Sequence, residues 1–188
     1  MSIYRIVPKR HVDRRGWFEE VYNAARFRQF GLDRPWCQDN QSFSHKAGTL
    51  RGLHFQEPPG AQAKLIRCLR GAIYDVVVDV RNNSPTFGKW LSTKLTAEDG
   101  IQLFIPPGYA HGFMSLEDNS EVIYKVDAFY SPELDSGILW NDPMIGINWI
   151  IPGSAPIVSD KDALLPSLQD FTCSFPYDGH PMRYIDIK

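Results

Sequence analysis

Short runs in which apolar and polar residues alternate dominate the middle of the chain. In the run A-I-Y-D-V-V-V-D-V-R, Val76, Val78 and Val80 occupy one face of an extended strand. Asp75 and Asp79 occupy the other face. Because a period of two residues and many β-branched side chains are typical of β-strands, this run is predicted to be a strand. Further strands are predicted for residues 64–69, 90–96, 101–105, 110–116 and 121–129.

Many short strands at close spacing favour an all-β fold. Gly, Pro, Asn or Asp residues bound the predicted strands, which suits tight turns between them. For a domain of this size we expect a sandwich or a closed barrel of the jelly-roll type. One short helix is predicted from Asn23, whose side chain can cap it, to Gly31, which can end it. We expect that helix to pack against the outside of the barrel.

The length of 188 residues predicts a single domain. No repeat, low-complexity tract or linker marks a second domain, and residues 169–188 are predicted to form an irregular C-terminal tail. The net charge of −2 provides no global positive field that would attract nucleic acid or an acidic membrane surface. A phosphate-binding site would therefore depend on local cations.

The N-terminal region and the cysteines indicate a soluble, cytoplasmic protein. No apolar run follows the basic residues near the N-terminus, so we expect neither a signal peptide nor a membrane anchor. No stretch reaches the roughly 18 consecutive apolar residues that a spanning helix needs. Cys37, Cys68 and Cys173 are odd in number and widely spaced, which indicates reduced thiols that fill space.

Polar residues interrupt the segment L-R-G-L-H-F-Q. Arg51 and His54 would point to opposite faces of a regular strand because three positions separate them. If both side chains serve one site, the strand must shift its register near Gly52, where a β-bulge forms easily. The alternative is that Arg51 is a surface residue and His54 a hydrogen-bonded residue of the core.

A second histidine, His111, follows a tight turn in the segment I-P-P-G-Y-A-H-G-F. The spacing P-x-G-x-x-H resembles the second half of the cupin motif pair, whose histidine often binds a metal ion. The first half would need an H-x-H pair followed by a glutamate, but His54 stands between Leu53 and Phe55. Because too few metal ligands converge, we expect no metal site, and a metal-dependent cupin isomerase or oxygenase is the alternative.

Nine short motifs follow one another over most of the chain. They are D-R-R-G-W-F-E-E (13–20), Q-D-N (38–40), L-R-G-L-H-F-Q (50–56), Q-A-K-L-I-R-C (62–68), S-P-T-F-G-K-W (84–90), I-P-P-G-Y-A-H-G-F (105–113), Y-K (124–125), W-N-D-P (140–143) and S-D-K-D (159–162). In this order and spacing they resemble the dTDP-4-dehydrorhamnose 3,5-epimerase family, a group of metal-free cupins. The resemblance implies a cupin-type jelly-roll β-barrel with a few short flanking helices.

The resemblance also implies an activity, the inversion of C3 and C5 of dTDP-4-dehydro-6-deoxy-D-glucose to give dTDP-4-dehydro-L-rhamnose. The hydrogens at both carbons flank the C4 ketone and can leave as protons if the enolate is stabilised. By the resemblance, His54 is the general base and Asp162 holds its imidazole. Tyr124 is the proton donor, and Lys64 lies against the keto oxygen. We expect no cofactor, because substrate and product are both ketones.

The residues that fall where the family binds nucleotide, diphosphate and sugar are Arg15, Phe18, Glu20, Gln38, Asn40, Arg51, His111, Phe129, Asp135 and Lys161. Asp135 stands where the family pattern has Glu. Phe129, where some relatives carry Tyr, can stack on a nucleobase, as Phe18 can. The family is commonly dimeric, so Arg15 and Glu20 are expected to complete the site of the other subunit in a homodimer.

Three other functions stay open. An epimerase of one centre, C3 or C5, or a ketoisomerase of a related nucleotide 4-keto sugar would use the same base and acid. A metal-dependent cupin enzyme is a further alternative. A non-catalytic module that binds a sugar or nucleotide would keep the barrel without the chemistry, but the joint presence of all four catalytic candidates argues against it. The nucleobase could also be one other than thymine.

Overall fold

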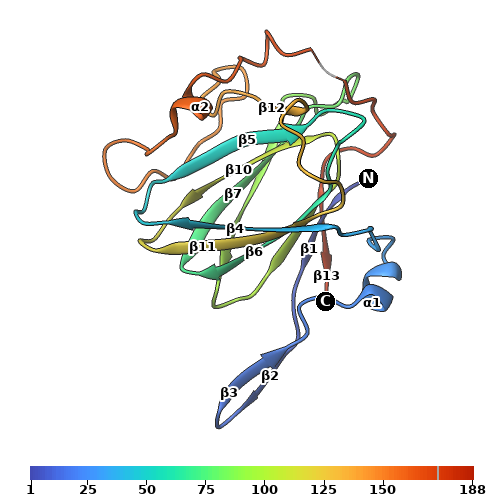
Figure 1. Cartoon of the computed structure of the whole chain (residues 1–188), viewed down its shortest axis with the longest axis vertical. Coiled ribbons are helices and arrows are strands. Elements are labelled where there is room, and N and C mark those ends of the chain that lie inside the picture. The colour runs from blue at the N-terminus through green and yellow to red at the C-terminus, as the bar shows by residue number, and fades with distance from the viewer. Residues whose placement is uncertain (173) are drawn as a thin grey trace.

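Two β-sheets face each other in the computed structural model, which describes residues 1–172 and 174–188 (Figure 1). The larger sheet has six strands in the order β13-β1-β9-β6-β11-β4. These strands are β13 (Tyr184–Ile187), β1 (Ile3–Ile6), β9 (Gln102–Ile105), β6 (Lys64–Arg70), β11 (Ser120–Val126) and β4 (Gln38–Ser44). All neighbours in this sheet are antiparallel except β1 and β13, which run parallel.

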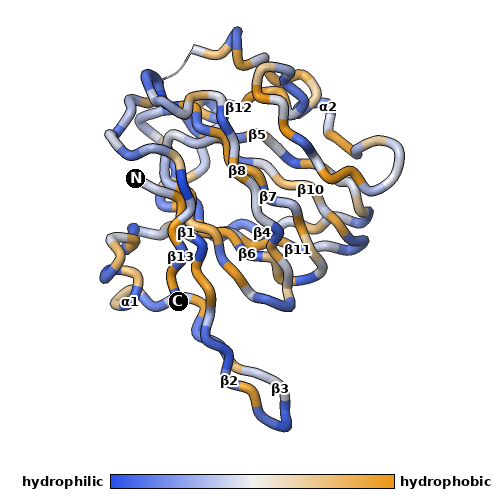
Figure 2. The backbone as a smooth tube through the Cα atoms, turned by 180° about the vertical axis from the view of Figure 1, so that it is seen from behind, coloured by the Kyte–Doolittle hydropathy of each residue, from blue (hydrophilic) through white to orange (hydrophobic). Residues whose placement is uncertain are grey.

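The smaller sheet has five strands in the order β12-β5-β10-β7-β8. These strands are β12 (Asp135–Gly137), β5 (Leu50–Gln56), β10 (Tyr109–Ser115), β7 (Ala72–Asp79) and β8 (Trp90–Thr96). A separate hairpin of β2 (Arg10–Asp13) and β3 (Gly16–Glu19) projects away from both sheets, and the tube in Figure 2 is hydrophilic at its tip. The two facing sheets form the predicted cupin-type jelly-roll. The strands predicted from the sequence, β6 to β11, begin and end close to their predicted limits.

Two short helices flank the sheets, α1 (Ala24–Arg28) and α2 (Asp160–Ala163). The predicted cap of α1 is confirmed, because the Asn23 side chain accepts hydrogen bonds from the backbone amides of Ala25 and Arg26. Phe27 of α1 is 5% exposed and packs on the outer side of the larger sheet beside Leu65. No helix among the described residues has the length and apolar character to cross a membrane.

The C-terminal tail differs from its prediction. Residues Tyr184–Ile187 form β13, which extends the larger sheet by pairing with β1 at its edge. The prediction of an irregular tail is therefore wrong for these four residues. The sequence Y-I-D-I alternates only twice, which is too short a signal to separate a strand from a loop, and pairing with β1 supplies the stabilisation.

The apolar residues form three layers of core. One cluster lies between the two sheets and includes Ile66 and Val77, and a second covers the outer face of the smaller sheet and includes Val76 and Trp149. A third lies beneath α1 on the outer face of the larger sheet. Strand β7 is therefore buried on both faces. Its apolar and polar residues alternate as predicted, but the face that carries Asp75 is enclosed between the sheets and does not meet solvent.

The cysteines agree in part with their prediction as thiols that fill space. Cys68 is 3% exposed and belongs to the core between the sheets. Cys37 is exposed, so its thiol does not fill interior space. Cys173 lies outside the described residues.

The register shift predicted near Gly52 is present. Arg51 pairs with Phe113 and His54 pairs with His111, so three steps on β5 match two steps on β10. Gly52 has a φ of 132°. A Cβ atom there would lie 2.5 Å from the Cα of Gly112 and 2.9 Å from the carbonyl oxygen of His111. The two strands approach each other closely only because both positions are glycine.

Replacing Gly52 by Ala should lower the free energy of unfolding by about 3 kcal/mol or more, because the positive φ and the backbone clash add up. Gly153→Ala is the matched control, since Gly153 also has a positive φ, 94°, but nothing lies within 4 Å of its Cβ position. The control should lose about 1 kcal/mol. Equilibrium denaturation in urea measures both values, and equal losses would contradict the close approach.

Candidate active site

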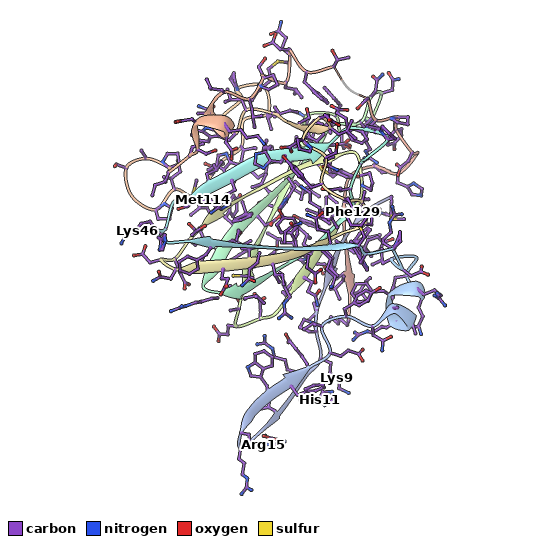
Figure 3. All side chains as sticks on the ribbon, in the orientation of Figure 1. Lys9, His11, Arg15, Lys46, Met114 and Phe129 are labelled. Carbon is purple, nitrogen blue, oxygen red and sulfur yellow. The ribbon has the colours of Figure 1, made fainter. Side chains whose placement is uncertain are left out.

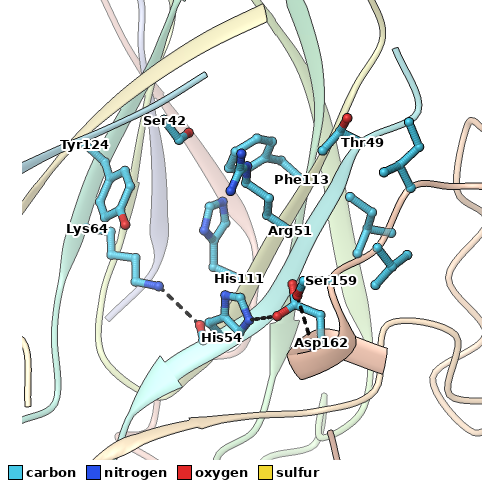
Figure 4. A pocket seen from close by; sticks show the side chains of 13 residues that line it. Ser42, Thr49, Arg51, His54, Lys64, His111, Phe113, Tyr124, Ser159 and Asp162 are labelled. Carbon is cyan, nitrogen blue, oxygen red and sulfur yellow. Dashed lines mark hydrogen bonds and ion pairs between the residues drawn. The ribbon is translucent and has the colours of Figure 1, made fainter. Parts of the chain in front are cut away.

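A cavity of about 490 Å³ opens between the two sheets (Figure 4). Its lining consists of Ser42, Thr49, Leu50, Arg51, His54, Lys64, His111, Phe113, Tyr124, Ile157, Val158, Ser159 and Asp162. A second cavity of about 330 Å³ is lined by Gln38, Asn40, His54, Phe55, Gln56, Gln62, Lys64, Tyr124, Tyr130, Asp135 and Lys161. His54, Lys64 and Tyr124 line both cavities and therefore stand where the two meet.

His54 on β5 is held by a buried carboxylate. Its Nε2 lies 2.9 Å from Oδ1 of Asp162, whose side chain is 6% exposed. Burial alone would raise the pKa of Asp162, but hydrogen bonds from His54 and from the Gly52 amide outweigh it and lower that pKa below its ordinary value. An ionised Asp162 can only accept, so Nε2 carries the proton and Nδ1 keeps a free lone pair.

Asp162 is positioned by the turn of helix that carries it. Ser159 caps α2, and its hydroxyl accepts a hydrogen bond of 3.1 Å from the Asp162 amide. The second carboxylate oxygen of Asp162 accepts a hydrogen bond of 3.0 Å from the amide of Gly52. The glycine that shifts the strand register therefore also binds the carboxylate that orients His54.

Lys64 at the start of β6 faces His54 across the space between the sheets (Figure 4). Its Nζ donates a hydrogen bond of 3.2 Å to the carbonyl oxygen of His54. Burial lowers the pKa of Lys64 to about 8, although the charges of Asp135 and Asp75 oppose the shift. At pH 7 the side chain is mostly an ammonium group, in surroundings poor in water.

Tyr124 on β11 belongs to the larger sheet, whereas His54 belongs to the smaller one. The two side chains therefore reach the common cavity from opposing walls (Figure 4). Burial raises the pKa of Tyr124 above its ordinary value, although the positive charge of Arg51 acts in the other direction. The phenol thus keeps its proton at neutral pH and can donate it.

His111 on β10 is hydrogen-bonded to an acid within the barrel. Its Nε2 lies 2.8 Å from Oδ2 of Asp75, which is fully buried. Burial lowers the pKa of His111 and raises that of Asp75. His111 stands directly opposite His54 in the pairing of β10 with β5.

Among the described residues, no group of three or more His, Cys, Asp or Glu side chains is placed to hold a metal ion.

Three of the predicted binding residues, Arg51, Gln38 and Asn40, line the two cavities. Arg51 lines the larger cavity, and one guanidinium nitrogen donates to the carbonyl oxygen of Phe43 at 3.1 Å. Gln38 and Asn40 line the smaller cavity from β4, and the Gln38 amide donates to Asn40 Oδ1 at 2.8 Å. Arg51 and His54 thus line one cavity, as the register shift allows.

Asp135 and Lys161 form the outer wall of the smaller cavity. Lys161 forms an ion pair with Oδ2 of Asp135, and the hydroxyl of Tyr130 donates to the same oxygen at 3.1 Å. Lys161 is 62% exposed, whereas the Asp135 side chain is 15% exposed. Phe129 precedes Tyr130 and is 71% exposed (Figure 3). It lines neither cavity, so the structure does not bring this predicted binding residue into the site.

Arg15, Phe18 and Glu20 do not reach either cavity of their own chain. Arg15 lies at the tip of the projecting hairpin, where it pairs only with Asp13 among the described residues (Figure 3). Phe18 is 70% exposed on β3. Glu20 follows β3 and accepts a hydrogen bond from the side chain of Asn23.

Several lining residues were missed by the sequence analysis. Ser42 lies two positions after Asn40, on the inward face of β4, and alternation along Q-D-N-Q-S could have revealed it. Asp75 lines neither cavity but contacts His111, which lines the larger one. It stands out in the sequence as an acid among valines, and a buried acid needs a partner, but only the fold identifies that partner as His111. The other missed lining residues are Thr49, Leu50, Phe113, Ile157, Val158 and Ser159 in the larger cavity and Phe55, Gln56, Gln62 and Tyr130 in the smaller one.

We expect Lys64 to titrate near pH 8, about two units below an ordinary lysine, because of its burial. Asp135→Asn should lower this pKa further, since the Asp135 carboxylate raises it. Asp118→Asn, which removes an exposed partner of Lys46, is the control and should leave Lys64 unchanged. NMR of lysine labelled with ¹³C at Cε, assigned with Lys64→Arg, measures the pKa. Titration of Lys64 together with the exposed lysines would contradict the expectation.

Comparisons with known proteins agree on one family. The family model of dTDP-4-dehydrorhamnose 3,5-epimerase matches residues 2–170. A dTDP-4-dehydrorhamnose 3,5-epimerase of Sinorhizobium fredii is 50% identical over 172 residues, which cover 92% of this chain and 88% of the relative.

Solved structures give the same result. The crystal structure of dTDP-4-dehydrorhamnose 3,5-epimerase from Bacillus anthracis, with TDP and PPi bound, has 48% identity and a TM-score of 0.83, and the match covers 86% of this chain and 91% of that one. A 3′-monoepimerase from Streptomyces bikiniensis in complex with dTDP-quinovose has 39% identity and a TM-score of 0.83, with 89% of this chain and 84% of that one covered.

Proposed function

The chain belongs to the dTDP-4-dehydrorhamnose 3,5-epimerase family, and we propose that it inverts C3 and C5 of dTDP-4-dehydro-6-deoxy-D-glucose to give dTDP-4-dehydro-L-rhamnose. The observation that carries the proposal is the placement of His54 and Tyr124 on facing sheets, with Lys64 beside both. A sugar ring held between the sheets would have a base on one side and an acid on the other.

His54 is the base in this mechanism. Its Nδ1, left unprotonated by the Asp162 contact at Nε2, takes the proton from the carbon next to the ketone. Asp162 keeps the imidazole in this tautomer and stabilises the imidazolium that forms. The carbon must lie within hydrogen-bond reach of Nδ1, so the sugar is bound against β5.

Lys64 stabilises the enolate. When the proton leaves, negative charge grows on O4, and an ammonium group in a water-poor cavity attracts that charge more strongly than one in bulk water. The pKa of about 8 allows Lys64 to remain charged at neutral pH. Lys64 thus lowers the barrier to proton loss at both carbons, since C3 and C5 share the same ketone.

Tyr124 returns a proton from the opposite face. Its raised pKa keeps the phenol protonated until the enolate carbon accepts the proton. Inversion follows because the proton leaves towards one sheet and returns from the other. Solvent must then reload Tyr124 and unload His54 before the second centre reacts.

The nucleotide diphosphate occupies the smaller cavity and its rim. Gln38 and Asn40 offer amide donors and acceptors to a nucleobase, and Phe129 offers a ring on which the base can stack. Lys161 on the rim of the smaller cavity and Arg51 in the adjoining larger cavity supply the local positive charge that the overall charge of −2 does not provide. Asp135 contributes to binding indirectly, because its carboxylate holds Lys161 and Tyr130 at the rim.

We further propose a cytoplasmic homodimer in which the β2–β3 hairpin of each subunit completes the site of the other. The hairpin projects from its own barrel and carries the motif residues Arg15, Phe18 and Glu20 away from its own cavities (Figure 1). An exposed Phe18 on a projecting hairpin suits a contact with a second subunit. The free thiols Cys37 and Cys68 suit a reducing compartment.

An epimerase of a single centre is the second candidate. The neighbour from Streptomyces bikiniensis, described as a 3′-monoepimerase, matches this chain with a TM-score of 0.83. The same base, acid and lysine could invert one carbon if the ring were bound in only one orientation. The number of carbons that exchange a proton with solvent separates the two functions.

Turnover in D₂O should label both C3 and C5 of the product, because each proton that returns comes from solvent by way of Tyr124. His54→Ala should slow exchange at both carbons about 10³-fold, since one base serves both. Ala163→Gly on the same turn of helix as Asp162 is a structural control for general loosening of α2. Mass spectrometry and proton NMR count and place the deuterium. Label at only one carbon would establish the single-centre reaction instead.

Mixing two inactive variants should restore activity if the site is shared between subunits. Arg15→Ala removes the side chain by which the hairpin is proposed to bind substrate in the other subunit, and His54→Ala removes the base. Each homodimer should therefore be impaired. After random re-association, half of the dimers are hybrids with one complete site, and activity should recover to about a quarter of the wild-type value. Activity that stays at the average of the two variants would refute the two-subunit site.

A further inference from the structure

The β2–β3 hairpin has two faces with different surroundings. Cross-strand pairing places Arg10 opposite Glu19 and Val12 opposite Trp17, so these four residues share one face. Phe18, paired with His11, lies on the other face. The motif W-F-E-E is thereby divided, with alternate residues directed to opposite sides of the hairpin.

Arg10 ties one face of the hairpin to the barrel. Its Nε donates to Glu19 at 2.8 Å, and its other nitrogens donate to the backbone carbonyl oxygens of Ala97 (3.0 Å) and Glu98 in the turn between β8 and β9. The guanidinium also lies 3.9 Å from the centre of the Trp17 ring. One side chain thus contacts both strands of the hairpin and the barrel.

Glu19 continues the connection to the larger sheet. Its side chain is 3% exposed, and its second oxygen lies 3.4 Å from the guanidinium of Arg67 on β6. A carboxylate this well enclosed between two guanidinium groups is held more firmly than an exposed ion pair. The connection Arg10–Glu19–Arg67 therefore joins the base of the hairpin to the strand that begins with Lys64.

The space around this connection is tight. A Cβ at Gly100 would lie 2.6 Å from Nη2 of Arg10 and 2.9 Å from Oε2 of Glu19. The turn that presents the carbonyl groups is itself ordered, since the Asp99 amide donates to the Thr96 hydroxyl at 3.0 Å. An isolated two-stranded hairpin is only marginally stable, so its direction must be set by such contacts at its base.

We infer that Arg10 is a positioning residue, which directs the hairpin so that its tip and its far face, with Arg15 and Phe18, reach the nucleotide of the other subunit. This inference rests on the proposed two-subunit site. Arg10 touches neither cavity of its own chain, so it acts on binding through the hairpin and not on the proton transfers.

Arg10→Met tests the inference, because Met keeps an unbranched stem and loses all three hydrogen bonds. We expect KM for the nucleotide sugar to rise about tenfold while kcat changes less than about threefold, since the hairpin contacts substrate away from the reacting carbons. Arg10→Lys should recover only part of the loss, because an ammonium group cannot reproduce the planar fork of donors. Light scattering should show that the variant keeps the oligomeric state of the wild type.

Arg5→Met is the matched control. Arg5 also pairs with a carboxylate, Asp186 at 2.7 Å, and its guanidinium lies over an aromatic ring, Tyr184, but it stands on β1 away from the hairpin. Its kinetics should match those of the wild type. Arg10→Met kinetics within twofold of this control would overturn the inference.

Subunit mixing separates a failure of the inference from a failure of the two-subunit site. When the Arg10→Met protein is mixed with the His54→Ala protein, about a quarter of all sites should combine an intact His54 with an intact hairpin from the partner chain. These sites should show the wild-type KM. No recovery here, while the Arg15→Ala mixture recovers, would show that Arg10 serves its own chain and would overturn the inference alone. If neither mixture recovers, the two-subunit site itself is wrong. Dissociation of Arg10→Met into monomers would also overturn the inference, since Arg10 would then support assembly.

Discussion

The close approach of β5 and β10 at Gly52 and Gly112 is the constraint on which the site depends. The missing side chains allow three residues of one strand to match two of the other, which turns Arg51 and His54 towards one cavity. The same shift exposes the Gly52 amide to the carboxylate of Asp162. A bulge in the backbone therefore both turns His54, the proposed base, into the cavity and binds the carboxylate of Asp162, which contacts its imidazole.

Enclosure between the sheets gives the ionisable groups their properties. Burial lowers the pKa of Lys64 to about 8 and raises that of Tyr124 above its ordinary value, so at neutral pH Lys64 is mostly charged and Tyr124 is neutral. Asp162 resists the effect of burial because two hydrogen bonds stabilise its charge. The cavity thus holds an ionised acid, a protonated phenol and an ammonium group together at neutral pH, which is the state that enolate chemistry requires.

The sequence predicted the jelly-roll strands because their alternation is regular. The family resemblance named His54, Lys64, Tyr124 and Asp162, which stand in separate motifs, and the structure brings all four to the lining of one cavity. The sequence did not predict β13, since a four-residue strand depends on its neighbour for stability. Nor did it predict the contacts of the ionisable groups, such as His111 with Asp75, because the residues are far apart in the chain and only strand pairing brings them together.

The structure separates chemistry from recognition. The proposed base, acid and lysine project from strands of a packed barrel, whereas the residues proposed to bind the nucleotide lie on the rim and on the projecting hairpin. Relatives that invert one centre or two can therefore share the same catalytic groups. In the proposed mechanism one base and one acid serve either reaction, so the number of carbons inverted would follow from the orientations of the sugar ring that the cavity admits. Phe113 and Ser42 line the same cavity as His54 and Tyr124 and therefore bound the space in which the ring can turn.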